Sequence, residues 1–173
     1  MYILADYELV YNTDSGYFEV EKDDSVVSLC PVCVRELVYR DKRLRIFKQN
    51  NGKAEHIKIH RLYCSKCDCL HNELPDCLVP YKHYGAEVVE NVLDEVSTPE
   101  DLSTEDYPCE ATMMRWKAWW ESNRIRACGI LASMRKRYHM PLPSLSDRRS
   151  LGSGWLCEIL HMICNSGGRL ECT

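Results

Sequence analysis

The sequence of 173 residues lacks long apolar runs, because no stretch approaches the roughly 18 apolar residues that a membrane-spanning helix needs. Its N-terminal residues also lack the basic segment followed by an apolar one that marks a secretory signal. These absences argue against a membrane association and predict a soluble, cytoplasmic protein. With 45% apolar residues, the chain is long enough to form one compact domain or two small ones.

Sequence motifs of several enzyme classes are also missing. There is no Gly-rich phosphate loop, no Ser nucleophile elbow and no His-Glu-x-x-His sequence. His71-Asn72-Glu73 matches the His-x-Glu of zinc deaminases, but that chemistry needs a Pro-Cys-x-x-Cys downstream. Cys109 follows a proline, yet residue 112 is threonine. The sequence therefore predicts a protein that is not an enzyme.

Cysteine, in contrast, is abundant. The chain has 11 cysteines, and an odd number with Cys-x-x-Cys spacings and no secretory signal favours metal ligation over disulfides. Two hooks, Cys30-Pro31-Val32-Cys33 and Cys64-Ser65-Lys66-Cys67, would place four thiolates tetrahedrally around Zn²⁺. We therefore predict a structural zinc site whose four ligands leave no open position for a reactive water: Cys30, Cys33, Cys64 and Cys67.

Two alternatives for metal binding stay open at this point. Three side chains near the second hook could replace one of its ligands: Cys69, His71 and Cys77. Another group shares one face of the last predicted helix and could hold a second metal ion: Cys157, His161 and Cys164, with Cys172 downstream. The simpler interpretation is that these are buried thiols and hydrogen-bonded histidines.

Charge is strongly segregated along the chain, although the net charge is only −4. Residues 1–28 carry seven acids and one lysine, and residues 84–111 carry nine acids and no base. Residues 34–63 hold nine basic residues against three acids, and residues 112–149 hold nine against two. The two basic segments could form a positive stripe for nucleic-acid phosphates, whereas the alternative is solvated faces of the fold.

The pattern of the first 80 residues is β-rich. Alternation within residues 1–29 predicts a hairpin around residues 12–16, ahead of the first hook. Strand-like residues 36–47 and 55–63 are joined by an Asn-Gly turn at residues 49–53. The two hooks should therefore lie at one end of this hairpin. Prolines are expected to limit regular structure from there to about residue 82.

The rest of the chain has helical patterns. Apolar spacing and capping signals predict helices at about residues 86–96, 98–105, 109–122, 123–138 and 153–165, with Ser153 as the cap of the last. The first three have the proportions of a helix-turn-helix unit, and residues 139–144 form a linker. The last helix has a strongly apolar side, which needs a partner surface from this chain or another.

A helix-turn-helix unit would use the front end of helix 109–122 for base contacts and nearby basic residues for phosphates. The candidate DNA-contacting residues are Thr112, Arg115, Lys117, Arg124, Arg126, Arg135, Lys136 and Arg137, with Arg148 and Arg149 as further phosphate contacts. RNA stays open as the nucleic acid. The tryptophans of this region are expected in the core or an interface rather than stacked on bases: Trp116, Trp119 and Trp120.

Several of these motifs together carry a resemblance to a known family: Cys30-Pro31-x-Cys33, Arg61-Leu62-x-Cys64-x-x-Cys67-x-x-x-His71, Leu74-Pro75, residues 80–84 and Pro108-x-Glu110-Ala111-Thr112-x-x-Arg115-Trp116. Residues 28–122 resemble a bacterial family that looks like the zinc-ribbon and helix-turn-helix front ends of insertion-sequence transposases, without the catalytic domain. The resemblance implies zinc on the four cysteines, a DNA partner and a mobile-element setting. Val34 and Asp68 stand where zinc ribbons often have glycine.

The sequence as a whole predicts an α+β protein in three segments. These are an N-terminal hairpin and zinc ribbon over 1–80, a helix-turn-helix domain over 81–140, and a linker with a C-terminal helix over 141–173. The expected function is double-stranded DNA binding, as a regulator or accessory targeting factor of a mobile element. The alternative is a zinc-stabilised adaptor that binds a protein or a second copy through its C-terminal helix.

Overall fold

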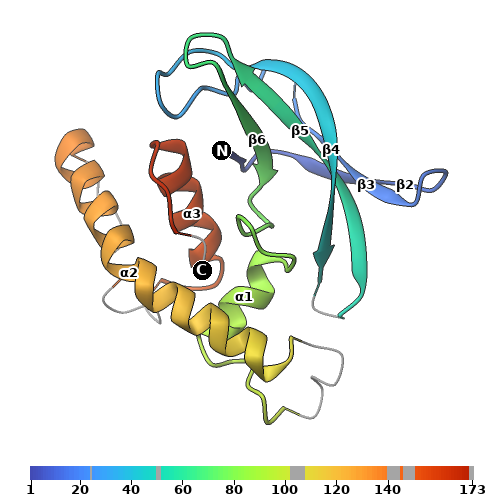
Figure 1. The fold of residues 1–173 in the computed structure, drawn as a ribbon, viewed down its shortest axis with the longest axis vertical. Coiled ribbons are helices and arrows are strands. Elements are labelled where there is room, and N and C mark those ends of the chain that lie inside the picture. Colours follow the sequence, from blue (N-terminus) through green and yellow to red (C-terminus); the bar gives the residue numbers. More distant parts are fainter. Residues whose placement is uncertain (24, 50–51, 102–107, 140–144, 146–150, 172–173) are drawn as a thin grey trace.

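The computed structural model describes the whole chain except residues 24, 50–51, 102–107, 140–144, 146–150 and 172–173. A curled sheet lies on one side and three helices on the other, with α3 between α2 and the sheet (Figure 1), so the α+β class is confirmed. None of the described helices is long and apolar enough to cross a bilayer. The elements in chain order are β1 (Tyr2–Leu4), β2 (Glu8–Asn12), β3 (Tyr17–Glu21), β4 (Val38–Lys48), β5 (Ala54–Cys64), β6 (Cys69–Pro75), α1 (Ala86–Leu93), α2 (Glu110–Tyr138) and α3 (Trp155–Asn165).

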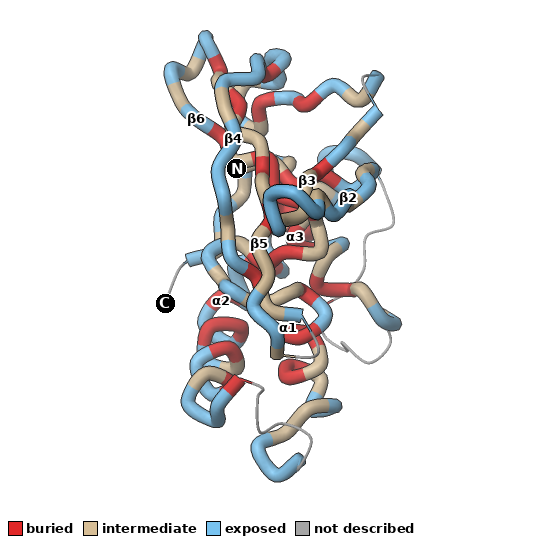
Figure 2. The backbone as a smooth tube through the Cα atoms, turned by 90° about the vertical axis from the view of Figure 1, so that its right-hand side faces the viewer, coloured by how far each residue is buried: buried red, intermediate tan, exposed pale blue. Residues whose placement is uncertain are grey.

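The sheet contains both predicted hairpins. β2 and β3 pair antiparallel through a turn in which Gly16 has φ +72°, and β4 pairs antiparallel with β5 along nearly its full length. The strand order is β1-β6-β5-β3-β2, with β4 on β5 as well. β4 is largely exposed (Figure 2), whereas alternate residues of β5, such as Ile57 and Ile59, are buried in the core of the sheet.

One strand contradicts the expectation that prolines limit regular structure after the second hook. Residues Cys69–Pro75 form β6, which is antiparallel to β5 and parallel to β1. Pro75 is the last residue of the strand, where the missing N–H does not interrupt the ladder. The parallel pairing with β1 joins residues about 70 positions apart, and no local sequence pattern predicts such a pairing.

α2 is one helix of 29 residues, so the prediction of two helices meeting at residues 122 and 123 was wrong. Asn123 is 1% exposed, and its side chain is satisfied there: Nδ2 donates to the carbonyl of Trp119 at 2.9 Å, and Oδ1 accepts from the amide of Glu171 at 2.7 Å. In the second half of this helix, Ile125 and Cys128 are exposed, whereas Ala127 and Leu131 are buried in the core.

A helix-turn-helix unit is not established by the described residues. Residues 98–101 form a turn, and the second half of the predicted helix 98–105 lies outside the described part of the chain, as does most of the linker 139–144. What the structure does show is that α1, α2 and α3 share one apolar core. Trp116, Trp119 and Trp120 are at most 3% exposed, which confirms their expected place in the core.

The apolar side of α3 finds its partner surface within this chain. Trp155, Leu156, Ile159, Leu160 and Ile163 are at most 1% exposed, and the ring of Trp155 packs edge-on against that of Trp120 at a centroid distance of 4.9 Å. The adaptor hypothesis needs an exposed apolar side of α3, and this side is already covered by other residues of the same chain.

The C-terminal segment also ties the helices to the sheet. The side chain of Asn165 makes two hydrogen bonds of 2.8 Å with the backbone of Ile3, accepting from its amide and donating to its carbonyl. Asn165 thereby replaces a neighbouring strand at the free edge of β1. Just beyond it, Gly167 lies against the carbonyl of Pro31 in the first hook. These contacts join the predicted C-terminal segment 141–173 to the predicted N-terminal segment 1–80.

The N-terminus of α3 is capped by Glu90 of α1, not by Ser153 as predicted. The residue at the cap position is Gly154, in a left-handed conformation with φ +87°, and no side chain of α3 itself caps the helix. The Glu90 carboxylate, 5% exposed, accepts from the amides of Gly154 at 2.6 Å and Leu156 at 2.9 Å. A negative charge at this end also complements the helix dipole.

Replacing Glu90 by alanine is therefore expected to lower the free energy of unfolding by about 2 kcal/mol, because two buried amides lose their acceptor. Urea-induced unfolding followed by circular dichroism measures this cost. Glu87→Ala, at an exposed position in the first turn of the same helix, is the matched control and should cost about 0.5 kcal/mol. Equal losses in the two variants would show that Glu90 does not cap α3.

Candidate metal centre

The two cysteine hooks have the same backbone turn. Cys64 is the last residue of β5, and the second hook leads into β6, whereas the first hook precedes β4. Val34 and Asp68, directly after the second cysteine of each hook, have φ values of 59° and 49°. This is the left-handed conformation for which glycine is more usual. The hooks therefore form the expected turns although the chain has no glycine there.

The first hook is also closed by backbone hydrogen bonds. The amide of Val34 donates to the carbonyl of Cys30 at 2.8 Å, and the amide of Cys30 donates to the carbonyl of Arg35 at 2.7 Å. Leu29 and Glu36 form an isolated antiparallel bridge on either side of the loop. These bonds hold the two sulfur atoms of the hook on the side that faces the second hook.

The four sulfur atoms lie close enough together to hold one metal ion. All of them are within 4.8 Å of one another; Cys33 and Cys64 are 3.5 Å apart, and Cys30 and Cys67 are 3.9 Å apart. A tetrahedral zinc site with bonds of about 2.3 Å has sulfur atoms about 3.8 Å apart. The four side chains therefore fit a tetrahedral ion of this size.

The protonation of the cluster also suits a cation. A hydrogen bond from the backbone of Cys67, followed by hydrogen bonds from the thiols of Cys33 and Cys30, outweighs burial and lowers the pKa of Cys64 to about 7. The pKa of Cys67 is raised, first by its contact with the thiol of Cys33 and then by burial. Four thiolates at this separation repel one another, so full ionisation of the cluster requires a positive ion at its centre.

His71 and Cys69 lie beside the cluster but outside the group of four. His71 Nε2 is 3.6 Å from Cys30 Sγ and 3.1 Å from Cys69 Sγ, and the histidine is 3% exposed. Its imidazole is thus placed to hydrogen-bond a sulfur of the cluster, as partners of metal ligands commonly do. Cys77 belongs to the core of the sheet instead.

A second metal centre does not form in the described part of the chain. Cys164 is buried and Cys157 half-buried on α3, but no second group of three or more potential ligands gathers there with His161. Burial is the first cause that raises the pKa of both thiols, to about 12 for Cys157 and about 11 for Cys164. Cys172 lies outside the described residues.

Comparison with known proteins identifies the region that contains the hooks. A family model described as a domain of unknown function, DUF6431, matches residues 30–116. The chain belongs to the DUF6431 family. No curated protein and no solved structure matches it. The DUF6431 region runs from the first cysteine of the metal centre to the first buried tryptophan of α2, and so includes β4, β5, β6 and α1.

A buried ionic network lies beside the candidate metal centre of this DUF6431 protein. The carboxylate of Glu73, 1% exposed, contacts Lys22 Nζ at 2.7 Å and His60 Nδ1 at 2.9 Å, and it accepts a short hydrogen bond from Ser28, two residues before the first hook. Burial favours a raised pKa, but hydrogen bonds from His60, Lys22 and Ser28 outweigh it and lower the pKa of Glu73 to about 2. Glu73 therefore links the residues before the first hook to β6.

The candidate DNA-contacting residues all lie on α2 of the DUF6431 protein, but they do not form one uniform surface. Arg115 folds back along its own helix, donating to the carbonyl of Ala111 at 3.1 Å and to Thr112 Oγ1 at 2.9 Å. Three others form ion pairs with acids: Lys117 with Glu95, Arg124 with Glu121, and Arg126 with Glu171. The exposed basic run Arg135–Arg137 ends the helix. Arg148 and Arg149 lie outside the described residues.

Proposed function

We propose that this protein is a zinc-stabilised DNA-binding protein, acting as a regulator or accessory targeting factor of a mobile genetic element. The observation that carries the proposal is the cluster of four cysteines in two matching turns, in a chain whose long helix α2 ends in an exposed basic run. The mobile-element setting rests on the resemblance of the sequence motifs to the front ends of transposases.

Zinc is the metal proposed for the cluster. Four thiolates in a tetrahedral arrangement are a donor set that zinc prefers, and the two hooks at the ends of strands are typical of zinc ribbons. With four protein ligands, the ion has no open position for water, so its role is structural. It would stabilise the turn from which β4 starts and the turn that joins β5 to β6.

α2 is the proposed DNA-binding element. Its buried side, with Trp116, Trp120 and Leu131, packs on the helical core, so the opposite side faces solvent over a length of about 43 Å. The basic side chains of that exposed side match the repeating negative charge of a nucleic-acid backbone. The run Arg135–Arg137 at its C-terminal end is the most concentrated part of this surface.

Affinity for duplex DNA is expected to fall by roughly 10³-fold between about 50 and about 200 mM salt. The double variant Lys136→Ala/Arg137→Ala should bind roughly tenfold more weakly and lower the salt slope by about 2, since each lost phosphate contact lowers it by about 1. Fluorescence anisotropy on fragments from the neighbourhood of the gene, with zinc content measured on the same sample, tests both expectations.

The charge-matched control is Arg35→Ala/Lys66→Ala, which removes two exposed basic residues from the cysteine hooks. It should change the affinity less than twofold. If the zinc-loaded protein shows no binding even at low salt, the DNA-binding proposal is wrong and the adaptor hypothesis becomes the better one. In that case the partner surface must be sought outside the covered side of α3.

A further inference from the structure

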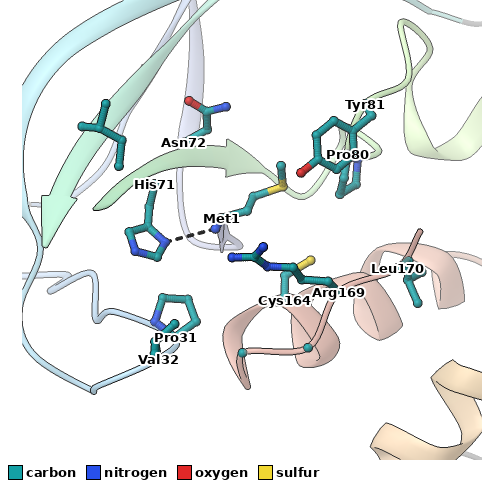
Figure 3. A pocket seen from close by; sticks show the side chains of 13 residues that line it. Met1, Pro31, Val32, His71, Asn72, Pro80, Tyr81, Cys164, Arg169 and Leu170 are labelled. Atoms are coloured by element: carbon teal, nitrogen blue, oxygen red, sulfur yellow. Dashed lines mark hydrogen bonds between the residues drawn. The ribbon is translucent and has the colours of Figure 1, made fainter. Parts of the chain in front are cut away.

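A cavity of about 230 Å³ lies between the first cysteine hook, β6 and the C-terminal segment (Figure 3). Pro31 and Val32 of the hook form one wall, His71 of β6 another, and Arg169 and Leu170 a third. Tyr81 closes it from the segment between β6 and α1. The cavity is thus built from parts of the chain that are far apart in the sequence and meet only through the fold.

The polar groups of this cavity are basic or hydrogen-bond donors. The guanidinium of Arg169 points toward His71 and the amine of Met1, and that amine lies 3.0 Å from His71 Nδ1 (Figure 3). None of the described residues that line the cavity is aspartate or glutamate. Arg169 therefore brings a positive charge to the cavity, and no aspartate or glutamate among the described lining residues balances it.

Tyr81 adds a hydroxyl and a strained backbone. Its phenol oxygen points into the cavity (Figure 3), and its φ of +62° is in the left-handed region that non-glycine residues seldom adopt. Strain of this kind persists where the surrounding structure imposes it, and it concentrates at binding sites. Here the conformation places a hydroxyl donor opposite the guanidinium of Arg169.

We infer that this cavity binds a phosphate group, held by Arg169 and Tyr81. A guanidinium offers a planar pair of donors to an oxyanion, and the hydroxyl approaches from another side, which suits a tetrahedral anion. The volume is several times the roughly 30 Å³ of one liquid water, so a phosphate with part of its carrier fits. The carrier is either a small phosphate ester or a nucleic-acid strand. The inference does not require that the protein binds DNA.

Phosphate binding can be tested with the zinc-loaded full chain by titrating inorganic phosphate at constant ionic strength, followed by calorimetry. One saturable site per chain is expected. Arg169→Gln should weaken binding at least tenfold, and Tyr81→Phe about threefold. Arg43→Gln, which removes an exposed arginine of β4 outside the cavity lining, should leave it unchanged. Absence of saturable binding would overturn the inference. So would equal phosphate binding by the wild type and by Arg169→Gln, provided that the variant keeps the melting temperature of the wild type.

A competition experiment separates the two carriers. If duplex DNA displaces phosphate and Arg169→Gln also weakens DNA binding, the site holds a phosphate of the nucleic-acid backbone. If phosphate stays bound in the presence of saturating DNA, or if the protein binds no DNA at all, the site holds a small phosphate ester. Either result supports the phosphate site. A failure of DNA binding alone does not contradict the inference of this site.

Discussion

Removing the metal with a chelator is expected to unfold the region of the cysteine hooks and to destabilise the whole sheet. The local core consists of Cys30, Leu37, Leu62 and Cys64, so half of its buried residues are proposed ligands. Structural zinc contributes about 10–16 kcal/mol to the folding of small zinc domains, which matches or exceeds the whole stability of a typical domain. Thermal unfolding with and without EDTA, and restoration by added Zn²⁺, measures the effect.

Single cysteine variants identify the ligands. Cys64→Ser should lose stoichiometric zinc and unfold as the chelated protein does, because it removes a thiolate from a closed set of four. Cys128→Ser, at an exposed position of α2, is the matched control and should keep one zinc ion and its melting temperature. Cys69→Ser should also keep its zinc. A loss of zinc from Cys69→Ser with retention in Cys64→Ser would overturn the assignment of the four ligands.

The cluster of four cysteines could be predicted from the sequence because its information is local. Each hook is a Cys-x-x-Cys turn, and the long antiparallel pair β4 and β5 brings the two turns together. The strand pattern and the Asn-Gly turn that predict this hairpin lie within about 30 residues. Only the residues after the hooks were ambiguous, and the positive φ values of Val34 and Asp68 show that the turn itself, not glycine, decides the conformation.

The rest of the fold depends on distant contacts that leave no local pattern. The sequence suggests a break in α2 at Asn123, a residue with modest helix propensity, but the backbone of Glu171 supplies the partners that make this residue stable inside a helix. Likewise, β1 has only three residues, and its pairing with β6 depends on an apolar environment that α3 completes. The cap of α3 comes from Glu90, 64 residues earlier than Gly154.

The candidate phosphate cavity was missed for the same reason. Arg169 lies in a C-terminal segment that has no recognisable motif, and Tyr81 lies in a stretch whose prolines suggest only an irregular connection. Neither residue forms a recognisable sequence motif with its neighbours in the chain. The two meet because Asn165 and the glycines after it bring the C-terminal segment against the first cysteine hook.

Gly167 is the position at which this arrangement is most sensitive to a single substitution. Its φ is +86°, and a Cβ added there would lie 2.6 Å from the carbonyl oxygen of Pro31, a backbone atom that cannot rotate away. Gly167→Ala is therefore expected to lower the free energy of unfolding by about 3 kcal/mol, through left-handed strain and through separation of the hook from the end of α3. Chemical denaturation of the zinc-loaded protein measures this loss.

Gly152→Ala separates the two contributions. Gly152 has φ +77° but nothing lies within 4 Å of an added Cβ, so its substitution should cost only the backbone strain of about 1 kcal/mol. Gly167→Ala should also release zinc to a competing chelator faster than Gly152→Ala, because the displaced carbonyl belongs to the hook between Cys30 and Cys33. If the two variants unfold with the same free energy and release zinc at the same rate, the close contact at Pro31 does not hold the hook. The C-terminal segment would then be held to the sheet by the hydrogen bonds of Asn165 and by the packing of α3 on Ile3.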